Sequence, residues 1–399
     1  MKRSFHYLWI GQSAANAADI LLIMVVMTLM YRVTGKASVM AAVPLLSMSA
    51  RFLSGMVSPI FLDKYGLKSL LVSSQVGKTV FLLILCLSSF SMAGQSVYLI
   101  LALHVCISFF DGWAAASRNA MLPYLVTTNL LMKVNSFVAA VDQSVQLGGW
   151  ALGGIIVAFF GVSYTLVLIV CFYLASTILM LLLPSIDDKR EKRNVGESLS
   201  EGWRYIGSVP FLFWGTISGG LSMLGGGVWI AAILYVFIQK VLHTSEVWWG
   251  YINASYMGGL LLGSLFIIKV SKQIGTRRGV LLFESAMMAG STFLFGIGIG
   301  PIACLLFSAL YGFFEQFVNI PYQTMLQTYV DRKKLAKVYS VTDMVGTVMF
   351  GLSTITMGMV SDNFGVQTSF YLGTSILLFS CFGYALAIKS NWRNTEHIR

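Results

Sequence analysis

Charged residues are scarce in this 399-residue chain: they make up 11% of it, whereas hydrophobic residues make up 57%. Soluble domains carry about 25% charged residues, so this composition excludes a chain that folds mainly in water. Acidic residues are scarcer than basic ones, with 16 Asp and Glu against 27 Lys and Arg. The resulting net charge of +11 raises the question of a polyanionic partner.

Cysteine and histidine are also rare, with five and four copies. The cysteines are single residues scattered through apolar stretches, which gives neither a disulfide framework nor metal-ligand spacing. The sequence also lacks a nucleophile elbow, a catalytic pairing of His with Cys and a complete phosphate-binding loop. We therefore expect no enzyme activity, no cofactor and no metal site.

Long apolar stretches are what the chain has in abundance. Twelve of them are about twenty residues or longer, which is the length that an α-helix needs to cross the ~30 Å hydrocarbon core of a bilayer. The predicted fold is therefore an all-α membrane protein with twelve transmembrane helices. The predicted spans are residues 5–31, 38–62, 70–93, 97–124, 130–160, 163–184, 209–239, 247–270, 279–299, 302–329, 336–360 and 365–388.

The basic residues are unevenly distributed between the two sides of the membrane. With a cytoplasmic N-terminus, 22 of the 27 Lys and Arg fall on cytoplasmic segments or helix ends, and Arg32, Lys36 and Lys240 lie near the opposite side. This bias follows the positive-inside rule and predicts a multi-pass protein of the cell membrane, in bacteria the inner or cytoplasmic membrane, with both termini in the cytoplasm. It also explains the net charge without a nucleic-acid partner; a basic patch for nucleic acid or lipid headgroups is the weaker alternative.

A polar stretch at 187–204 divides the spans into two sets of six. Seven residues of 121–136 recur at an offset of 204 in 325–340, where the fourth span meets the fifth and the tenth meets the eleventh. Parallel repeats of six spans are typical of transporters that bind substrate between two bundles. The predicted domains are an N-terminal six-helix bundle (1–184), a cytoplasmic linker with a short amphipathic helix (185–208) and a C-terminal six-helix bundle (209–399).

Polar residues inside the spans indicate a water-filled cavity. A charge at the bilayer centre costs about 3 kcal/mol even on the lenient insertion scale, so each one needs a partner, a cavity or a function. In the span 97–124, for example, His104, Ser108 and Asp111 share one helix face. The predicted polar lining of the cavity is Gln12, Asn16, His104, Ser108, Gln146 and Asn319.

Four acids inside the spans are the candidate proton-coupling groups: Asp19, Asp111, Asp142 and Glu315. Asp111 and Glu315 differ by the repeat offset of 204, which places two carboxyl groups at equivalent depths in the two halves. Mid-span carboxyl groups of this kind can take up and release a proton during transport.

A structural role is the alternative for each acid, with Asp111 paired to Arg51 or Asp142 paired to Arg118. Two other charged residues, Lys78 and Glu284, lie near cytoplasmic span ends. We expect these two to be structural, with side chains that extend to the membrane surface.

The loop 63–68 is a candidate cytoplasmic gate. When the cytoplasmic ends of the bundles close, Asp63 is placed to cap the start of the span 336–360 and to pair with a basic group such as Arg118. The alternative is a solvated turn that obeys the positive-inside rule. The predicted gate residues are Asp63, Lys64, Gly66, Lys68 and Arg118.

At these residues the chain resembles the major facilitator superfamily. The loop from Asp63 to Lys68 is similar to the signature between that superfamily's second and third helices, although Leu67 replaces a basic residue. Residues 149–154 are similar to its antiporter motif through Gly149, Gly153 and Gly154, with Trp150 in place of the proline. Ser108 stands where many proton-coupled exporters of the superfamily carry an arginine.

Within the superfamily, the chain most resembles exporters of the macrolide-efflux and siderophore-export type. The resemblance covers nearly the whole chain and is carried by Trp9, Gly11 and Gln12, by 119–123 with Asn135 and Ser136, by Gly258, Gly259 and Gly263, and by Pro321, Gln327, Val338 and Ser340.

That resemblance implies export of a small, often amphipathic molecule, drug-like or siderophore-like, by alternating access coupled to proton antiport. The expected partners are this small-molecule substrate, protons and the lipid bilayer, and we expect a monomer. The alternatives are a facilitator or importer of a small metabolite and, more remotely, a membrane scaffold or sensor that transports nothing. The sequence leaves the substrate open, because fold does not determine it.

Overall fold

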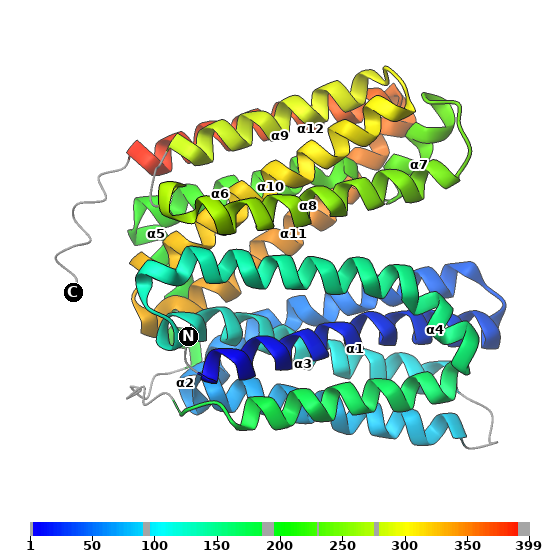
Figure 1. Ribbon diagram of the computed structural model, residues 1–399, viewed down its shortest axis with the longest axis vertical. Helices are drawn as coiled ribbons and strands as arrows, with labels where there is room; N and C mark the ends of the chain where they lie inside the picture. Colours follow the sequence, from blue (N-terminus) through cyan, green and yellow to red (C-terminus); the bar gives the residue numbers. More distant parts are fainter. Residues whose placement is uncertain (1–2, 91–95, 186–194, 230, 275–278, 390–399) are drawn as a thin grey trace. The chain divides into compact units, whose positions relative to one another are not determined.

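The computed structural model describes residues 3–90, 96–185, 195–229, 231–274 and 279–389 (Figure 1). Most of the charged linker, the basic pair Arg277 and Arg278, and the C-terminal tail lie outside these residues. The helices are α1 (Arg3–Thr34), α2 (Ala37–Phe90), α3 (Val97–Leu125), α4 (Leu131–Leu181), α5 (Val195–Ser208), α6 (Pro210–Gly225), α7 (Ala231–Lys240), α8 (Val247–Ile274), α9 (Gly279–Ile297), α10 (Pro301–Tyr329), α11 (Arg332–Phe364) and α12 (Val366–Lys389), with short 3-10 helices η1 (Thr128–Leu130) and η2 (Gly226–Trp229).

Two of these helices are too long for one crossing. At about 1.5 Å per residue, the 54 residues of α2 would extend far beyond a ~30 Å hydrocarbon core. Gly66 (φ 82°, ψ 162°) interrupts α2, and Gly161 (φ 75°, ψ 170°) interrupts α4. Only glycine adopts this backbone conformation readily, so each glycine turns one continuous helix into two spans.

The prediction of twelve transmembrane helices is confirmed. Within the described residues, nine helices are long and apolar enough to cross a membrane, α2 and α4 each count twice, and α9 supplies a shorter apolar helix. The predicted seventh span, 209–239, is not one helix, because α6, η2 and α7 follow one another there. Large apolar side chains face outward, such as Phe159 at 82% exposure and Phe379 at 68%, as expected for a surface that contacts lipid.

The chain folds into two compact units. Unit 1 contains Met1–Thr128, Ser144–Gly202 and Asp331–Val341, and unit 2 contains Asn129–Gln143, Trp203–Val330 and Thr342–Arg399. Each unit therefore includes the start of one helix from the other half of the sequence: α11 in unit 1 and α4 in unit 2. The helix α5 lies in the predicted linker range, and the division into two six-helix bundles stays a prediction.

Glycine contacts bring α8 and α10 of unit 2 close together. A Cβ added to Gly259 of α8 would lie 2.0 Å from the carbonyl oxygen of Ala309, and one added to Gly312 of α10 would lie 2.3 Å from the carbonyl oxygen of Tyr256. Small residues at such crossings let helix backbones approach in membranes, where van der Waals packing replaces the hydrophobic driving force.

We predict that Gly259→Ala lowers the melting temperature of the detergent-purified protein, because the added methyl group would overlap the α10 backbone. Overpacking of this kind destabilises by about 1–3 kcal/mol. The control is Gly258→Ala, whose added Cβ has no atom within 4 Å. Equal melting temperatures for the two variants would show that the α8–α10 contact is not close.

Candidate functional site

Four charged side chains meet inside unit 1 and form what we call the paired-charge cluster. The Lys78 Nζ atom lies 2.8 Å from Asp19 Oδ1 and 2.7 Å from Asp111 Oδ1, and Arg51 Nη2 lies 2.9 Å from Asp111 Oδ2. The Tyr173 hydroxyl donates to Asp19, and its ring centroid lies 4.8 Å from Lys78 Nζ. Two carboxylates and two cations thus neutralise one another.

The pairing accounts for how such charges remain inside an apolar fold. Lys78 has no exposed side-chain surface, and the two aspartates are 14% and 17% exposed. Ions removed from water lose several kcal/mol of hydration each, which is recovered only when the geometry is good and the remaining hydrogen bonds are made. Here both oxygens of Asp19 and both of Asp111 accept a charged or hydroxyl donor.

Close packing of α2 on α3 positions the cluster. A Cβ at Gly112 would lie 2.6 Å from Ser54 Oγ and 3.0 Å from the carbonyl oxygen of Arg51. The absence of that Cβ lets the two helices approach, so that Asp111, next to Gly112, reaches Arg51. The alternative pairing of these two residues is therefore present.

The expectation that Lys78 and Glu284 extend to the membrane surface is wrong. Lys78 is fully buried, and Glu284 is 7% exposed. The sequence carried a signal for Lys78: Ser74, Gln75 and Lys78 recur at helical spacing, and all three have no exposed surface. That face points into the protein, where the aspartates of α1 and α3 are within reach, so the lysine pairs instead of extending outward.

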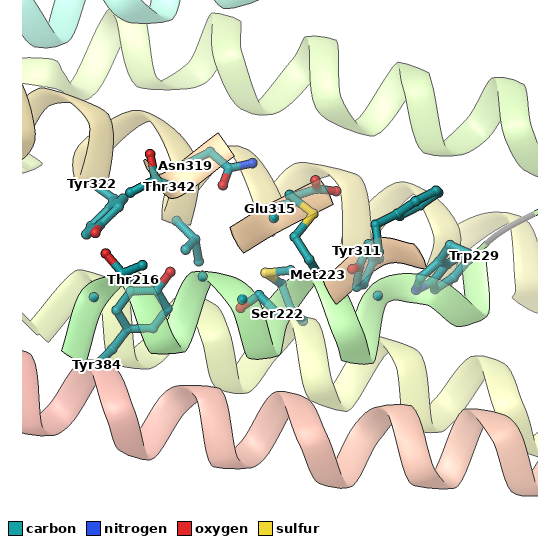
Figure 2. Close-up of a pocket in the computed structure, with 18 of the residues that line it drawn as sticks. Thr216, Ser222, Met223, Trp229, Tyr311, Glu315, Asn319, Tyr322, Thr342 and Tyr384 are labelled. Atoms are coloured by element: carbon teal, nitrogen blue, oxygen red, sulfur yellow. The ribbon is translucent and has the colours of Figure 1, made fainter. Parts of the chain in front are cut away.

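Unit 2 contains a cavity of about 410 Å³ (Figure 2). Its walls come from α6, η2, α8, α9, α10, α11 and α12. Figure 2 shows Glu315 near the middle, with Tyr311 and Trp229 towards one end and Tyr322 and Tyr384 towards the other. Glycines make room for these rings: a Cβ at Gly215 would lie 2.6 Å from a ring carbon of Tyr322.

Glu315 carries the only formal charge among the described residues that line this cavity. The Tyr256 hydroxyl donates to its Oε2 atom at 2.8 Å, and Asn319 lies one helical turn further along α10. Within the described part of the chain, Glu315 makes no ion pair. The repeat-equivalent acids thus differ: Asp111 has two cationic partners, and Glu315 has neutral ones.

A second charged group, which we call the gate cluster, joins three segments of unit 1. Asp63 Oδ2 accepts hydrogen bonds from Lys337 Nζ and Ser198 Oγ, each at 2.6 Å, and Lys337 Nζ also lies 2.6 Å from Glu201 Oε2. Lys337 is only 3% exposed. A Cβ at Gly202 would lie 2.9 Å from the Lys337 carbonyl oxygen, so α5 lies directly against the start of α11.

Asp63 therefore contacts the start of α11 through the side chain of Lys337. The cap of this helix by Asp63 and the pairing with Arg118 stay predictions. Lys337 lies in the repeated segment 325–340 and Glu201 in the polar stretch 187–204, but neither was a predicted gate residue. Among the other predicted gate residues, Gly66 forms the turn in α2 and Lys64 Nζ lies 5.0 Å from the Tyr65 ring centroid. Lys68 lies beyond that turn in α2, and Arg118 lies in α3.

The predicted cavity-lining residues of α1 and α3 lie within unit 1. Gln12 Nε2 donates to Asn16 Oδ1 at 2.8 Å, and His104 Nε2 lies 2.7 Å from Ser47 Oγ. Ser108 is buried in α3. Only Asn319 of the six predicted lining residues borders the cavity of unit 2.

The remaining predicted residues lie on α4. Asp142 is half-buried in the segment that belongs to unit 2, and Gln146 is exposed. The antiporter-like glycines face α1 in part: a Cβ at Gly149 would lie 3.0 Å from Ile20, and one at Gly153 would lie 2.3 Å from Met24 Sδ. Gly154 has no atom near its added Cβ.

Sequence comparison gives a consistent family. The model of the Major Facilitator Superfamily matches residues 8–354 and 217–395. An uncharacterized MFS-type transporter of Bacillus subtilis (strain 168), YfmI, is 26% identical over 393 residues, covering 96% of this chain and 97% of that protein. The enterobactin exporter EntS of Shigella dysenteriae serotype 1 (strain Sd197) is 24% identical over 299 residues, covering 72% of this chain and 68% of that protein.

Structural comparison supports the same fold. The crystal structure of a bacterial homologue of the iron transporter ferroportin, in an outward-facing state, superposes with a TM-score of 0.75 at 15% sequence identity. The match covers 98% of this chain and 100% of that one. At this identity the likeness concerns the fold alone.

We predict that Lys78→Gln destabilises the protein strongly, because it leaves two adjacent aspartates with only Arg51. Breaking a buried ion pair costs about 3–5 kcal/mol, which a lower melting temperature should report. Adding Asp19→Asn to Lys78→Gln should restore part of the loss by removing one unpaired charge. Lys240→Gln, at an exposed position, is the control; a loss no greater than in this control would rule out a stabilising role for the cluster.

We also predict that Lys337→Gln opens the gate cluster, because Asp63 and Glu201 then lack their shared cation. The reporter is Ser340→Cys, at a position 2% exposed, in a background without the five native cysteines. Labelling by a thiol reagent should accelerate about tenfold or more, since ~1.4 kcal/mol corresponds to tenfold in an equilibrium. Lys333→Gln, at an exposed position on the same helix, should leave the rate unchanged. Equal labelling rates in both variants would contradict a role of the gate cluster in closing this region.

Proposed function

The chain belongs to the major facilitator superfamily of membrane transporters, and on this basis we propose that it is a secondary active transporter that exports a small amphipathic molecule in exchange for protons. Export is supported by the enterobactin exporter among the relatives. The proposed location is the cell membrane, with both termini in the cytoplasm, in accord with the distribution of Lys and Arg.

The observation that carries the proton coupling is the contrast between the two charged sites. Asp19 and Asp111 are already neutralised by Lys78 and Arg51. Glu315 faces a cavity and has only neutral partners in the described residues. A carboxyl group in that setting can hold a proton or lose it to create a binding charge, whereas a paired carboxylate gains little by either change. Glu315 is therefore the first candidate, and Asp19, Asp111 and Asp142 are the further ones.

Antiport then follows from competition at one group. In the outward-open state Glu315 takes up a proton and releases the substrate; in the inward-open state it loses the proton to the cytoplasm and binds substrate again. The gate cluster closes the cytoplasmic end in the first state and opens in the second. Glu315 binds either the proton or the substrate but not both at once. Proton entry is therefore linked to substrate exit.

We predict that Glu315→Gln abolishes uphill export but not exchange, because the amide cannot titrate. The substrate is first identified as the compound that accumulates inside cells lacking the gene and is depleted from their medium. The purified protein is then placed in liposomes, where pH-driven transport and counterflow of the labelled compound are measured separately. The variant should lose the first and keep the second when the compound is supplied at a concentration that compensates for its weaker binding to the variant.

The outcome against this mechanism is equally specific. Uphill export with unchanged pH dependence in Glu315→Gln, Asp19→Asn, Asp111→Asn and Asp142→Asn would exclude proton coupling through these acids. Counterflow in the wild type with no response to a pH gradient would identify a facilitator instead.

A further inference from the structure

Among the described residues, the lining of the unit 2 cavity combines one carboxylate with several aromatic side chains. We infer that it binds the positively charged group of an amphipathic organic monocation, with the charge between Glu315 and the rings of Trp229, Tyr256 and Tyr311. This inference names the substrate class of the proposed exporter and therefore rests on the proposed function.

The charge of the cavity lining favours a cationic ligand. The described lining of the cavity includes Glu315 but no lysine, arginine or histidine. An anion would therefore meet a carboxylate and no compensating donor cation, and a neutral ligand would leave that carboxylate buried without a counterion. A ligand with one positive charge compensates Glu315, whereas a second positive charge would itself be unpaired there.

The aromatic residues next to Glu315 also favour a cationic ligand. The Trp229 ring stacks on Tyr311 with centroids 4.7 Å apart and lies nearly parallel to Tyr256, at 6.3 Å and 13°. Tyr256 is also the residue whose hydroxyl donates to Glu315, and the three rings and the carboxylate line the same cavity. Aromatic faces attract cations through their quadrupole, with Trp the strongest, and groups of such rings recognise quaternary ammonium ligands.

The rest of the cavity fits an apolar body. Its volume of about 410 Å³ lies within the ~300–1,000 Å³ range of drug-sized ligand pockets. Met223, Met288, Val318 and Phe350 also line it. Methionine adapts to irregular apolar shapes. These side chains therefore select a ligand for its hydrophobicity more than for its shape.

The test compares two ions of similar shape and opposite charge, tetraphenylphosphonium and tetraphenylborate. Their binding to the full-length protein in lipid nanodiscs is measured by equilibrium dialysis, and binding to empty nanodiscs of the same lipid is subtracted. We expect saturable binding of the cation and none of the anion. Glu315→Gln should weaken cation binding about tenfold or more, since ~1.4 kcal/mol is tenfold, whereas Glu246→Gln, the same change at an exposed glutamate, should not.

Two variants of Tyr256 separate the ring from its hydroxyl. Tyr256→Phe keeps the ring face and removes the hydrogen bond to Glu315, so we expect cation binding to survive. Tyr256→Leu keeps an apolar side chain of similar length without the ring and should weaken binding about five- to thirtyfold, the range of a desolvated cation–π contact. Unchanged melting temperatures exclude misfolding as the cause; if Tyr256→Leu unfolds, the comparison is repeated with Trp229→Phe and Trp229→Leu.

The outcomes distinguish this inference from the proposed coupling. Saturable binding of the anion, or wild-type cation affinity in Glu315→Gln, would overturn the organic-cation assignment, even if an identified compound is exported with protons. Cation-selective binding whose affinity does not fall at acidic pH would keep the assignment and exclude exchange of cation and proton at Glu315. The other titratable groups that line the cavity are Tyr256, Tyr311, Tyr322 and Tyr384, and their Phe variants serve as controls for the pH response.

Discussion

The free energy of holding a charge away from water is the constraint on which this structure depends. Inside unit 1 it is met by pairing, since Lys78 is fully buried between two aspartates and a second cation completes the balance. Inside unit 2 it is met differently, because Glu315 has a tyrosine hydroxyl and an open cavity instead of a cation. Under the proposed function, this difference separates charge that holds helices together from charge that is available to a ligand.

The fold was largely predictable because span length is set by the bilayer rather than by tertiary contacts. Even the turns at Gly66 and Gly161 fall between predicted spans. The exception is the predicted span 209–239, where the helix breaks at three consecutive glycines. A Cβ at Gly225 would lie 2.8 Å from the carbonyl oxygen of Gly373, so the break accompanies a close helix crossing that no apolar period reveals.

The sites were predictable only in part. Position inside apolar spans identified Asp19, Asp111 and Glu315 as candidates. Helical spacing also placed Asp111 on one face with His104 and Ser108, because spacing fixes which residues share a face. It did not identify their partners, since Lys78, Tyr173 and Tyr256 lie on other helices and meet the acids only through tertiary packing. For the same reason the repeat offset suggested equal roles for Asp111 and Glu315, although their surroundings differ.

The glycine crossing of α8 with α10 also has a mechanical consequence. Gly259 and Gly312 lock the two helices backbone to backbone, and Tyr256 and Glu315 project from this locked pair. In the proposed transport cycle we expect the two helices to move together, which would preserve the distance between the Tyr256 ring and the Glu315 carboxylate. Entry and exit of a ligand would then depend on displacement of other walls, α6 with η2 and α11, whose glycines at positions 219, 220 and 346 border the cavity. A rigid pair of α8 and α10 beside movable walls would keep the Tyr256 ring and the Glu315 carboxylate at a constant distance while the cavity opens.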